Sequence, residues 1–308
     1  MSNTEATTII DIFRVILGIA LLCFASYTDL KTRRVKNEVW MLMGLCGAIL
    51  LIIQMFFEKK AWEYYLIFLP VGILFGSMFF EHEPLYDTEK KKFNFILFAL
   101  YIIGILALFY QIYALWGENY FFRLLIIPVL IIFFFILYQM GVLHGGADTK
   151  AMMAIAILTP FYTHFFGFPI LHFSSERLAE AMELFFPFAF LVLMNSVLFV
   201  VWALLAFLVL NTAKRDTAFP EMLLGYKMDI EEVGKKFVWS MERIVDGERV
   251  IVLFPKRHDK DSLEKLKEMG VKRIWVTPKI PFIVFIMAGF IISAFLGNIF
   301  AAMLGLLG

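Results

Sequence analysis

Eight long apolar segments constrain this chain more than any other feature of its sequence. They lie at about 8–28, 38–57, 62–80, 93–116, 120–140, 149–170, 183–210 and 280–304. A helix needs roughly 20 apolar residues to cross the ~30 Å hydrocarbon layer of a bilayer. Hydrophobic residues make up 61% of the 308 positions, which is more than a soluble core would bury. The sequence therefore predicts an all-α polytopic membrane protein with about eight transmembrane helices.

Lysine and arginine are distributed unevenly among the segments between the predicted helices. Loops 29–37, 81–92 and 141–150 hold 8 of these residues, whereas loops 58–63, 117–123 and 171–182 hold 4. Basic residues favour the cytoplasmic side of a membrane, and short loops carry most of that signal. We expect a protein of the cell membrane with the first set of loops in the cytoplasm and both termini outside.

One polar stretch, residues 211–279, separates the seventh apolar segment from the eighth. Within it, "KFVWSMERIVDGERVIVLF" alternates around Asp246 and Gly247, a pair suited to a hairpin turn. "KDSLEKLKEMG" follows as a short helix ended by Gly270, and "VKRIWVT" as another strand. The predicted organisation is a membrane core at 1–210, a small cytoplasmic α+β module at 211–279 and a last transmembrane helix at 280–308. The module carries no coherent catalytic set and is interpreted as a regulatory or scaffolding appendage.

Motifs for metals and nucleotides are missing from the sequence. The two cysteines, Cys23 and Cys46, fall in predicted helices, and no Cys/His cluster has the spacing of zinc ligands. Walker and dinucleotide-binding glycine patterns are also absent. We expect neither a cofactor, nor a metal, nor a nucleic-acid partner.

Two aspartates lie where the predicted topology meets the cytoplasmic edge of the bilayer. Asp29 ends the first apolar segment, and Asp148 follows Gly145, Gly146 and Ala147 in "HGGADTK". Ionisable groups at membrane depth are expensive and often functional. The two glycines allow a tight turn, positive φ or close backbone approach, and Asp148 is then predicted to cap the following helix, with Lys150 nearby. The alternative is a solvated Asp29 beside basic residues and an ordinary helix cap at Asp148.

Bringing the two carboxyl groups together would give them a specific chemistry. Adjacent carboxylates cannot both ionise easily, so the pair holds one shared proton. Such a pair can activate a water molecule and protonate a departing amine, which is the chemistry of aspartic proteases.

The two motifs resemble those of the archaeal preflagellin and prepilin peptidases, which belong with the type IV prepilin peptidases among the Gly-x-Gly-Asp membrane aspartic proteases. The first motif is "DLKTRRVKN", with Asp29, Val35 and Asn37, and the second is "GGADTK", with Asp148 and Lys150. Ala147 stands where the strict pattern has glycine. The polar module followed by "WVTPKIPFIVFIMAGF" is similar to a carboxy-terminal extension of some archaeal members.

The resemblance implies that Asp29 and Asp148 are catalytic and that Gly145, Gly146, Ala147, Lys150 and Asn37 support them. The implied substrates are archaellin or pilin-like precursors, whose short basic leader is removed on the cytoplasmic side just before an apolar helix in the lipid bilayer. Loop 81–92 lacks the cysteine-rich zinc element of many bacterial relatives. We therefore expect peptidase activity without methylation of the new amino terminus.

Three alternatives remain open from the sequence. An intramembrane protease like presenilin or signal peptide peptidase also uses paired aspartates, but the chain has no Pro-Ala-Leu element. A secondary transporter could use the two aspartates as proton or cation sites. A non-catalytic scaffold could act through residues 211–279.

Other charged residues have simpler interpretations. Asp11 and Arg14 are spaced to pair on the first helix, in a structural role. His144 is close enough in sequence to influence Asp148, although backbone or water is the more common partner of an interfacial histidine. The acids of loop 81–92 could meet a basic leader, but a solvated loop is the simpler prediction.

Overall fold

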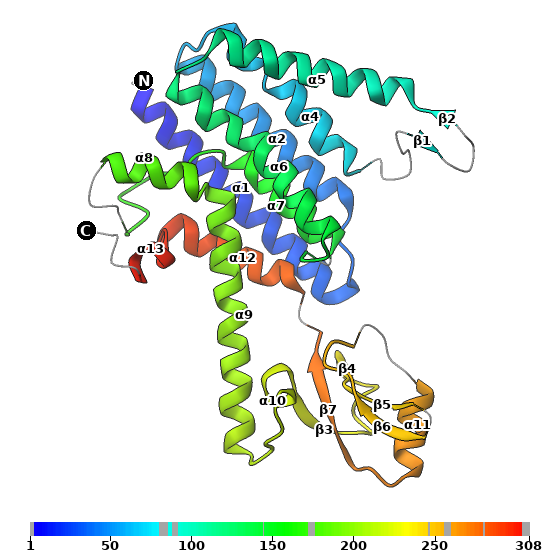
Figure 1. Cartoon of the computed structure of the whole chain (residues 1–308). Coiled ribbons are helices and arrows are strands. Elements are labelled where there is room, and N and C mark those ends of the chain that lie inside the picture. The colour runs from blue at the N-terminus through cyan, green and yellow to red at the C-terminus, as the bar shows by residue number, and fades with distance from the viewer. Residues whose placement is uncertain are drawn as a thin grey trace. The chain divides into compact units, whose positions relative to one another are not determined.

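The computed structural model describes residues 3–79, 86–87, 92–143, 145–171, 176–245, 247–255, 260–279 and 281–303. The chain forms two compact units, Met1–Val197 with Phe282–Gly308, and Leu198–Pro281. The first unit is helical and the second contains most of the strands (Figure 1). Each unit is described by itself.

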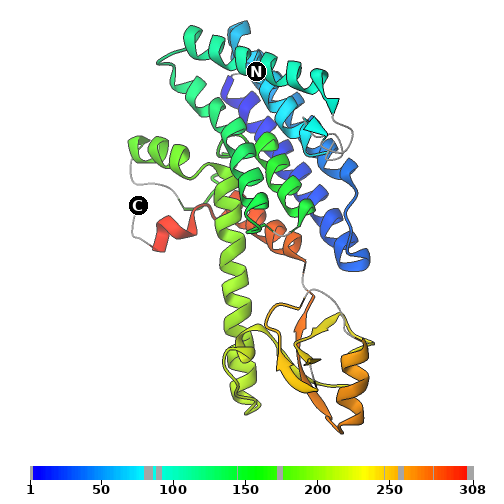
Figure 2. The ribbon, with the colours of Figure 1, turned by 45° about the vertical axis from the view of Figure 1, so that its right-hand side comes forward.

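The first unit is a helical bundle with one short antiparallel strand pair, β1 with β2. Both views show α1, α2, α6 and α7 side by side (Figures 1 and 2). The elements in chain order are α1 (Asn3–Thr32), α2 (Asn37–Phe57), α3 (Trp62–Tyr65), α4 (Phe68–Ser77), β1 (Tyr86–Asp87), β2 (Lys92–Phe93), α5 (Phe95–Ala114), α6 (Asn119–Gln139), α7 (Gly146–Leu158), α8 (Glu176–Phe185), the first part of α9 (Phe188–Ala213), α12 (Phe282–Phe295) and α13 (Ile299–Met303).

Five helices among the described residues are long and apolar enough to cross a membrane, namely α1, α2, α5, α6 and α9. The prediction of eight full-length spans is not confirmed, because the segments 62–80, 149–170 and 280–304 form shorter helices. The helix is interrupted at Leu66 and Ile67, and Pro70, in the first turn of α4, has no N–H to offer the carbonyl of Leu66. Pro160 disfavours helical geometry at Thr159, so α7 ends at Leu158. Gly297, with φ +96°, separates α12 from α13.

Helix α7 lies at the centre of the first unit. All ten residues from Thr149 to Leu158 are buried. The helices α1, α2, α6 and α12 pack around it. A helix that is apolar on every side is stable only when neighbours cover it, so this arrangement satisfies the composition of α7.

The closest approach between α2 and α7 depends on Gly47. A Cβ at this position would lie 2.5 Å from the Cα of Leu158 and 2.7 Å from its nitrogen. Real Cβ atoms do not approach backbone so closely, and backbone cannot turn aside as a side chain can. The absence of a side chain at Gly47 therefore sets the distance between the two helices.

The second unit is a small α+β module built around strand β7. The module contains the last part of α9, α10 (Glu221–Leu224), β3 (Tyr226–Asp229), β4 (Val238–Ser240), β5 (Glu242–Val245), β6 (Glu248–Ile251), α11 (Lys260–Glu268) and β7 (Arg273–Pro278). β7 is the central strand of an antiparallel sheet of order β3-β7-β4, and β5 pairs with β6. The predicted hairpin, helix and last strand are confirmed; β3 and α10 were not foreseen. Gly247 takes the positive φ that the turn needs, while Asp246 lies outside the described residues.

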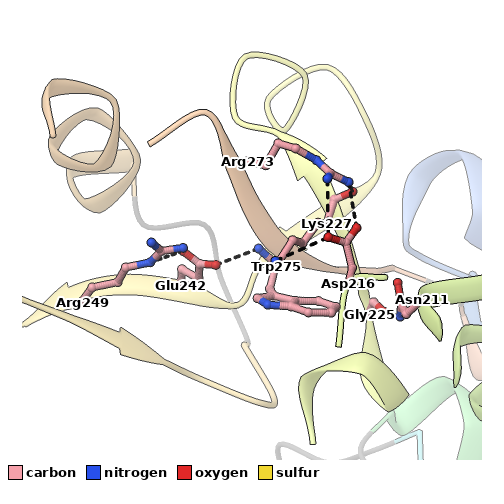
Figure 3. A network of polar contacts seen from close by, with 8 residues as sticks. All are labelled: Asn211, Asp216, Gly225, Lys227, Glu242, Arg249, Arg273 and Trp275. Carbon is pink, nitrogen blue, oxygen red and sulfur yellow. Dashed lines mark hydrogen bonds and ion pairs between the residues drawn. The ribbon is translucent and has the colours of Figure 1, made fainter. Parts of the chain in front are cut away.

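Buried charges connect the elements of this module (Figure 3). Glu242 accepts a hydrogen bond from the backbone N–H of Trp275 at 2.9 Å and one from Nε of Arg249 at 2.6 Å. Asp216 accepts from Nη2 of Arg273 at 3.0 Å and pairs with Nζ of Lys227 at 3.5 Å. The Glu242 carboxylate thus satisfies a backbone donor of the central strand, a task normally done by another strand.

Replacing Gly47 with alanine should destabilise the first unit. We expect Gly47→Ala to lower the free energy of unfolding by roughly 1–3 kcal/mol, because the new Cβ meets the backbone of Leu158. The unfolding midpoint in mixed detergent micelles measures the change. Gly72→Ala in α4 is the matched control, since its Cβ would meet no atom within 4 Å. Equal effects of the two substitutions would contradict the assigned role of Gly47.

Removing the Glu242 carboxylate should destabilise the second unit. We expect Glu242→Ala to cost about 2–4 kcal/mol, because the Trp275 N–H and the Arg249 guanidinium both lose a partner. Pulse proteolysis of the full chain in increasing urea, scored by cleavage within 198–281, measures this. Glu232→Ala removes an exposed acid that pairs with Lys236 in the neighbouring turn, and it should leave the urea midpoint unchanged.

Candidate active site

The first predicted site residue, Asp29, lies in the last turn of α1. Its backbone carbonyl accepts a hydrogen bond from the N–H of Arg33 at 2.9 Å, and Arg33 takes a φ of +59°. This left-handed residue turns the chain out of α1 and toward the start of α2 at Asn37. The Asp29 side chain is half-buried, whereas those of Lys31 and Arg34 are exposed. Asp29 therefore does not behave as a freely solvated juxtamembrane acid.

The second residue, Asp148, lies in the first turn of α7 rather than at its cap. Gly145 is the N-cap, with φ −103° and ψ 121°, and Thr149 donates the first helical hydrogen bond to its carbonyl at 3.1 Å. The prediction that Asp148 caps the helix is therefore wrong. The cause is that the helix begins two residues before Asp148, at Gly146. The half-buried Asp148 carboxylate stays in the first turn, where free N–H groups and the helix dipole favour negative charge.

Gly145 allows the Asp148 carboxylate to approach the backbone closely, and its own backbone angles are not unusual. Neither Gly145 nor Gly146 has positive φ. A Cβ at position 145 would overlap Oδ2 of Asp148 and lie 3.0 Å from its Cγ. The sequence left open a tight turn, a positive φ or a close backbone approach at the glycine pair. At Gly145 the structure has the close approach.

The two aspartates come from helices that contact one another. α1 and α7 pack together, and Asp29 is within electrostatic range of Asp148. Arg33 is within electrostatic range of Asp29. Two carboxyl groups in such proximity favour a state with one proton between them. Such a state offers one proton acceptor and one proton donor.

A lysine connects the two sequence motifs. The buried Lys150 donates from Nζ to Oδ1 of Asn37 at 3.3 Å, joining α7 to the first residue of α2. The same nitrogen lies 5.2 Å from the centroid of the Phe79 ring. Ala147 is half-buried and packs against the core of the first unit. Phe79 was not foreseen from the sequence, because nothing separates it from the many other phenylalanines of the apolar segments.

The remaining charged residues have these positions. Asp11 and Arg14 form a buried ion pair of 3.2 Å, as the spacing predicted, and Asp11 also accepts from the N–H of His164 at 3.1 Å. This pair lies eighteen residues before Asp29 on α1, or about 27 Å along the helix. His144 and most of loop 81–92 lie outside the described residues.

The part of the chain that the structure describes contains no set of side chains that could bind a metal ion. Those residues contain no group of three or more histidine, cysteine, aspartate or glutamate side chains that could hold an ion. Cys23 contacts the sulfur of Met287 at 3.4 Å, which is a packing contact between α1 and α12.

Comparisons with known families give two matches. A model of the type IV leader peptidase family matches residues 16–90, which include Asp29 and Asn37. A model described as the archaeal peptidase A24 C-terminus type II matches residues 217–299. Asp148 lies in neither match.

Three proteins of Methanococcus voltae and Methanocaldococcus jannaschii are similar to this chain. A preflagellin peptidase of Methanococcus voltae is 28% identical over 220 residues, covering 69% of this chain and 89% of that protein. A preflagellin peptidase of Methanocaldococcus jannaschii is 26% identical over 302 residues, covering 94% and 98%. An uncharacterized protein of the same organism is 23% identical over 282 residues, or 89% of each chain.

The family matches agree with the fold. Several helices are long and apolar enough to cross a membrane, which fits a multi-pass membrane peptidase. The C-terminal match covers most of the second unit and continues into α12 and the start of α13. The chain is similar to the type IV leader peptidase family over residues 16–90 and to the archaeal peptidase A24 C-terminus of type II over residues 217–299.

Proposed function

We propose that this chain is a membrane aspartic endopeptidase that removes leader peptides from archaellin or type IV pilin-like precursors. Cleavage takes place at the cytoplasmic face and leaves the new amino terminus unmethylated. The observation that supports this proposal is that Asp148 lies within electrostatic range of Asp29, far away in the sequence, on two helices that pack together. The names of two relatives, both preflagellin peptidases, support the substrate class.

The proposed chemistry needs one ionised and one protonated carboxyl group. The ionised aspartate takes a proton from a water molecule as the water oxygen attacks the scissile carbonyl carbon. The protonated aspartate donates a hydrogen bond to the developing oxyanion. When the tetrahedral intermediate collapses, a proton passes to the departing nitrogen and the C–N bond breaks. The pair ends the cycle with one proton, as it began.

The supporting residues act by holding the two motifs together. Lys150 and Asn37 join α7 to α2, and Gly47 allows the same two helices to pack closely further along. Gly145 leaves space for the Asp148 carboxylate. A displacement of about 1 Å in a catalytic group can cost roughly a hundredfold in rate, so these contacts bear directly on activity.

Replacing either aspartate of the pair should abolish cleavage. Asp29→Asn and Asp148→Asn should each lower the cleavage rate of an archaellin precursor by at least about 10³-fold, because an amide can neither take nor give the required proton. Cleavage is measured in detergent without an ion gradient, with correct membrane insertion verified and the product mass checked for methylation. Glu38→Gln, the same change at an exposed acid in the first turn of α2, is the matched control and should cleave normally.

Each outcome separates the proposal from its alternatives. Retained cleavage in either aspartate variant would remove the pair as the catalytic centre. If the wild type cleaves no precursor but takes up an ion or solute along a gradient, the chain is a transporter.

The second prediction concerns the contact between the motifs. Lys150→Met and Asn37→Ala should each lower kcat about tenfold, because each breaks the same link between α7 and α2. The kcat of the double variant should be no lower than the kcat of the less active single variant, because substitutions of two residues in contact do not have additive effects. Arg34→Gln, at an exposed position between α1 and α2, should leave kcat unchanged. Additive losses for Lys150 and Asn37 would show that the two residues act independently.

A further inference from the structure

An apolar groove lies between α2 and α4, and we call it the α2–α4 groove. Its volume is about 320 Å³, and every residue that lines it is apolar. α2 contributes Met41, Leu45 and Ile52, which are 48%, 60% and 41% exposed. α4 forms the facing wall, and Ile157 of α7 also lines the groove.

One end of the groove lies beside Lys150, two residues after Asp148. Met41 lies one turn after Asn37, the residue that bonds Lys150. Phe79 lines the groove and also contacts Lys150 through its ring. From Met41 to Ile52 the groove follows eleven residues of α2, or about 16 Å. The groove therefore leads from the candidate site along α2.

Two glycines of α4 keep the groove open. Gly72 and Gly76 are one turn apart, and a Cβ at either position would meet no atom within 4 Å. Small residues on a membrane-facing helix let a second helix approach closely, and this contact drives helix association where lipid supplies no hydrophobic force. The space above these glycines thus suits a helix backbone.

We propose that the α2–α4 groove binds the first three turns of the apolar helix of the precursor. This inference rests on the proposed function and extends it to the docking of substrate. A helix in the groove would begin beside Lys150 and Phe79, so the peptide bond just before that helix would lie at the aspartate pair. The groove would thereby determine which peptide bond is cleaved, namely the one at the start of the apolar helix. An acyl chain of a lipid would gain nothing from the continuity between groove and site.

Filling the groove tests the proposal. Gly76→Leu should raise KM about tenfold for a full precursor. The same variant should leave kcat/KM unchanged for a shortened peptide that ends a few residues beyond the cleavage point and lacks the apolar helix. Ala99→Leu adds bulk to an exposed position of α5 outside the groove and should change neither value. An unchanged KM for the full precursor, or equal losses on both substrates, would overturn the proposal.

A second measurement tests the proposal independently, in case the Gly76→Leu variant fails to fold. Photo-reactive benzoylphenylalanine replaces Leu45 in the Asp148→Asn protein, which should bind precursor without cleaving it. Position 45 should crosslink to the apolar helix of the precursor, whereas the same residue in place of Leu106 of α5, which is 61% exposed against 60% for Leu45, should not. Crosslinks from position 45 only to lipid would assign the groove to the bilayer. Failure of the wild type to cleave any precursor would instead refute the proposed function itself.

Discussion

The close packing of α2 against α7 is the contact on which the rest of the first unit depends. Gly47 brings the backbones of the two helices together near Leu158, and the bond between Lys150 and Asn37 joins them at their other end. With both ends fixed, α7 keeps one orientation inside a shell of surrounding helices. Asp148 lies in the first turn of this helix, so the packing of α7 determines where its carboxylate lies.

The same packing explains how an apolar groove and a polar site share one end. α2 begins at the site and then forms one wall of the groove, while α7 begins at the site and supplies Ile157 to the lining. Phe79 belongs to both, because its ring contacts Lys150 and also faces the groove. The proposed substrate, whose polar leader joins an apolar helix, has the same division between a polar and an apolar part.

The second unit solves a different problem, since it must fold with little apolar surface. Its core consists of a few residues around Ile274 and Val276 on β7. Buried carboxylates add to this core by bonding to backbone and to arginine, as Glu242 does with Trp275 and Arg249. Local patterns predicted the β5–β6 hairpin and the strand β7, because alternation and turn residues are properties of adjacent positions. β3 was missed, because a four-residue strand carries too little pattern.

By itself the sequence determined the membrane class, the two aspartate motifs and the hairpin, helix and last strand of the polar module, since all of these depend on composition or on neighbouring residues. It misjudged the length of three helices, where Pro70, Pro160 and Gly297 interrupt apolar runs. Only the tertiary structure decided that Lys150 meets Asn37, 113 positions away, and that Phe79 joins them. The physical reason is that lipid-facing and buried faces of a membrane helix are equally apolar, so no periodicity reveals which faces pack together.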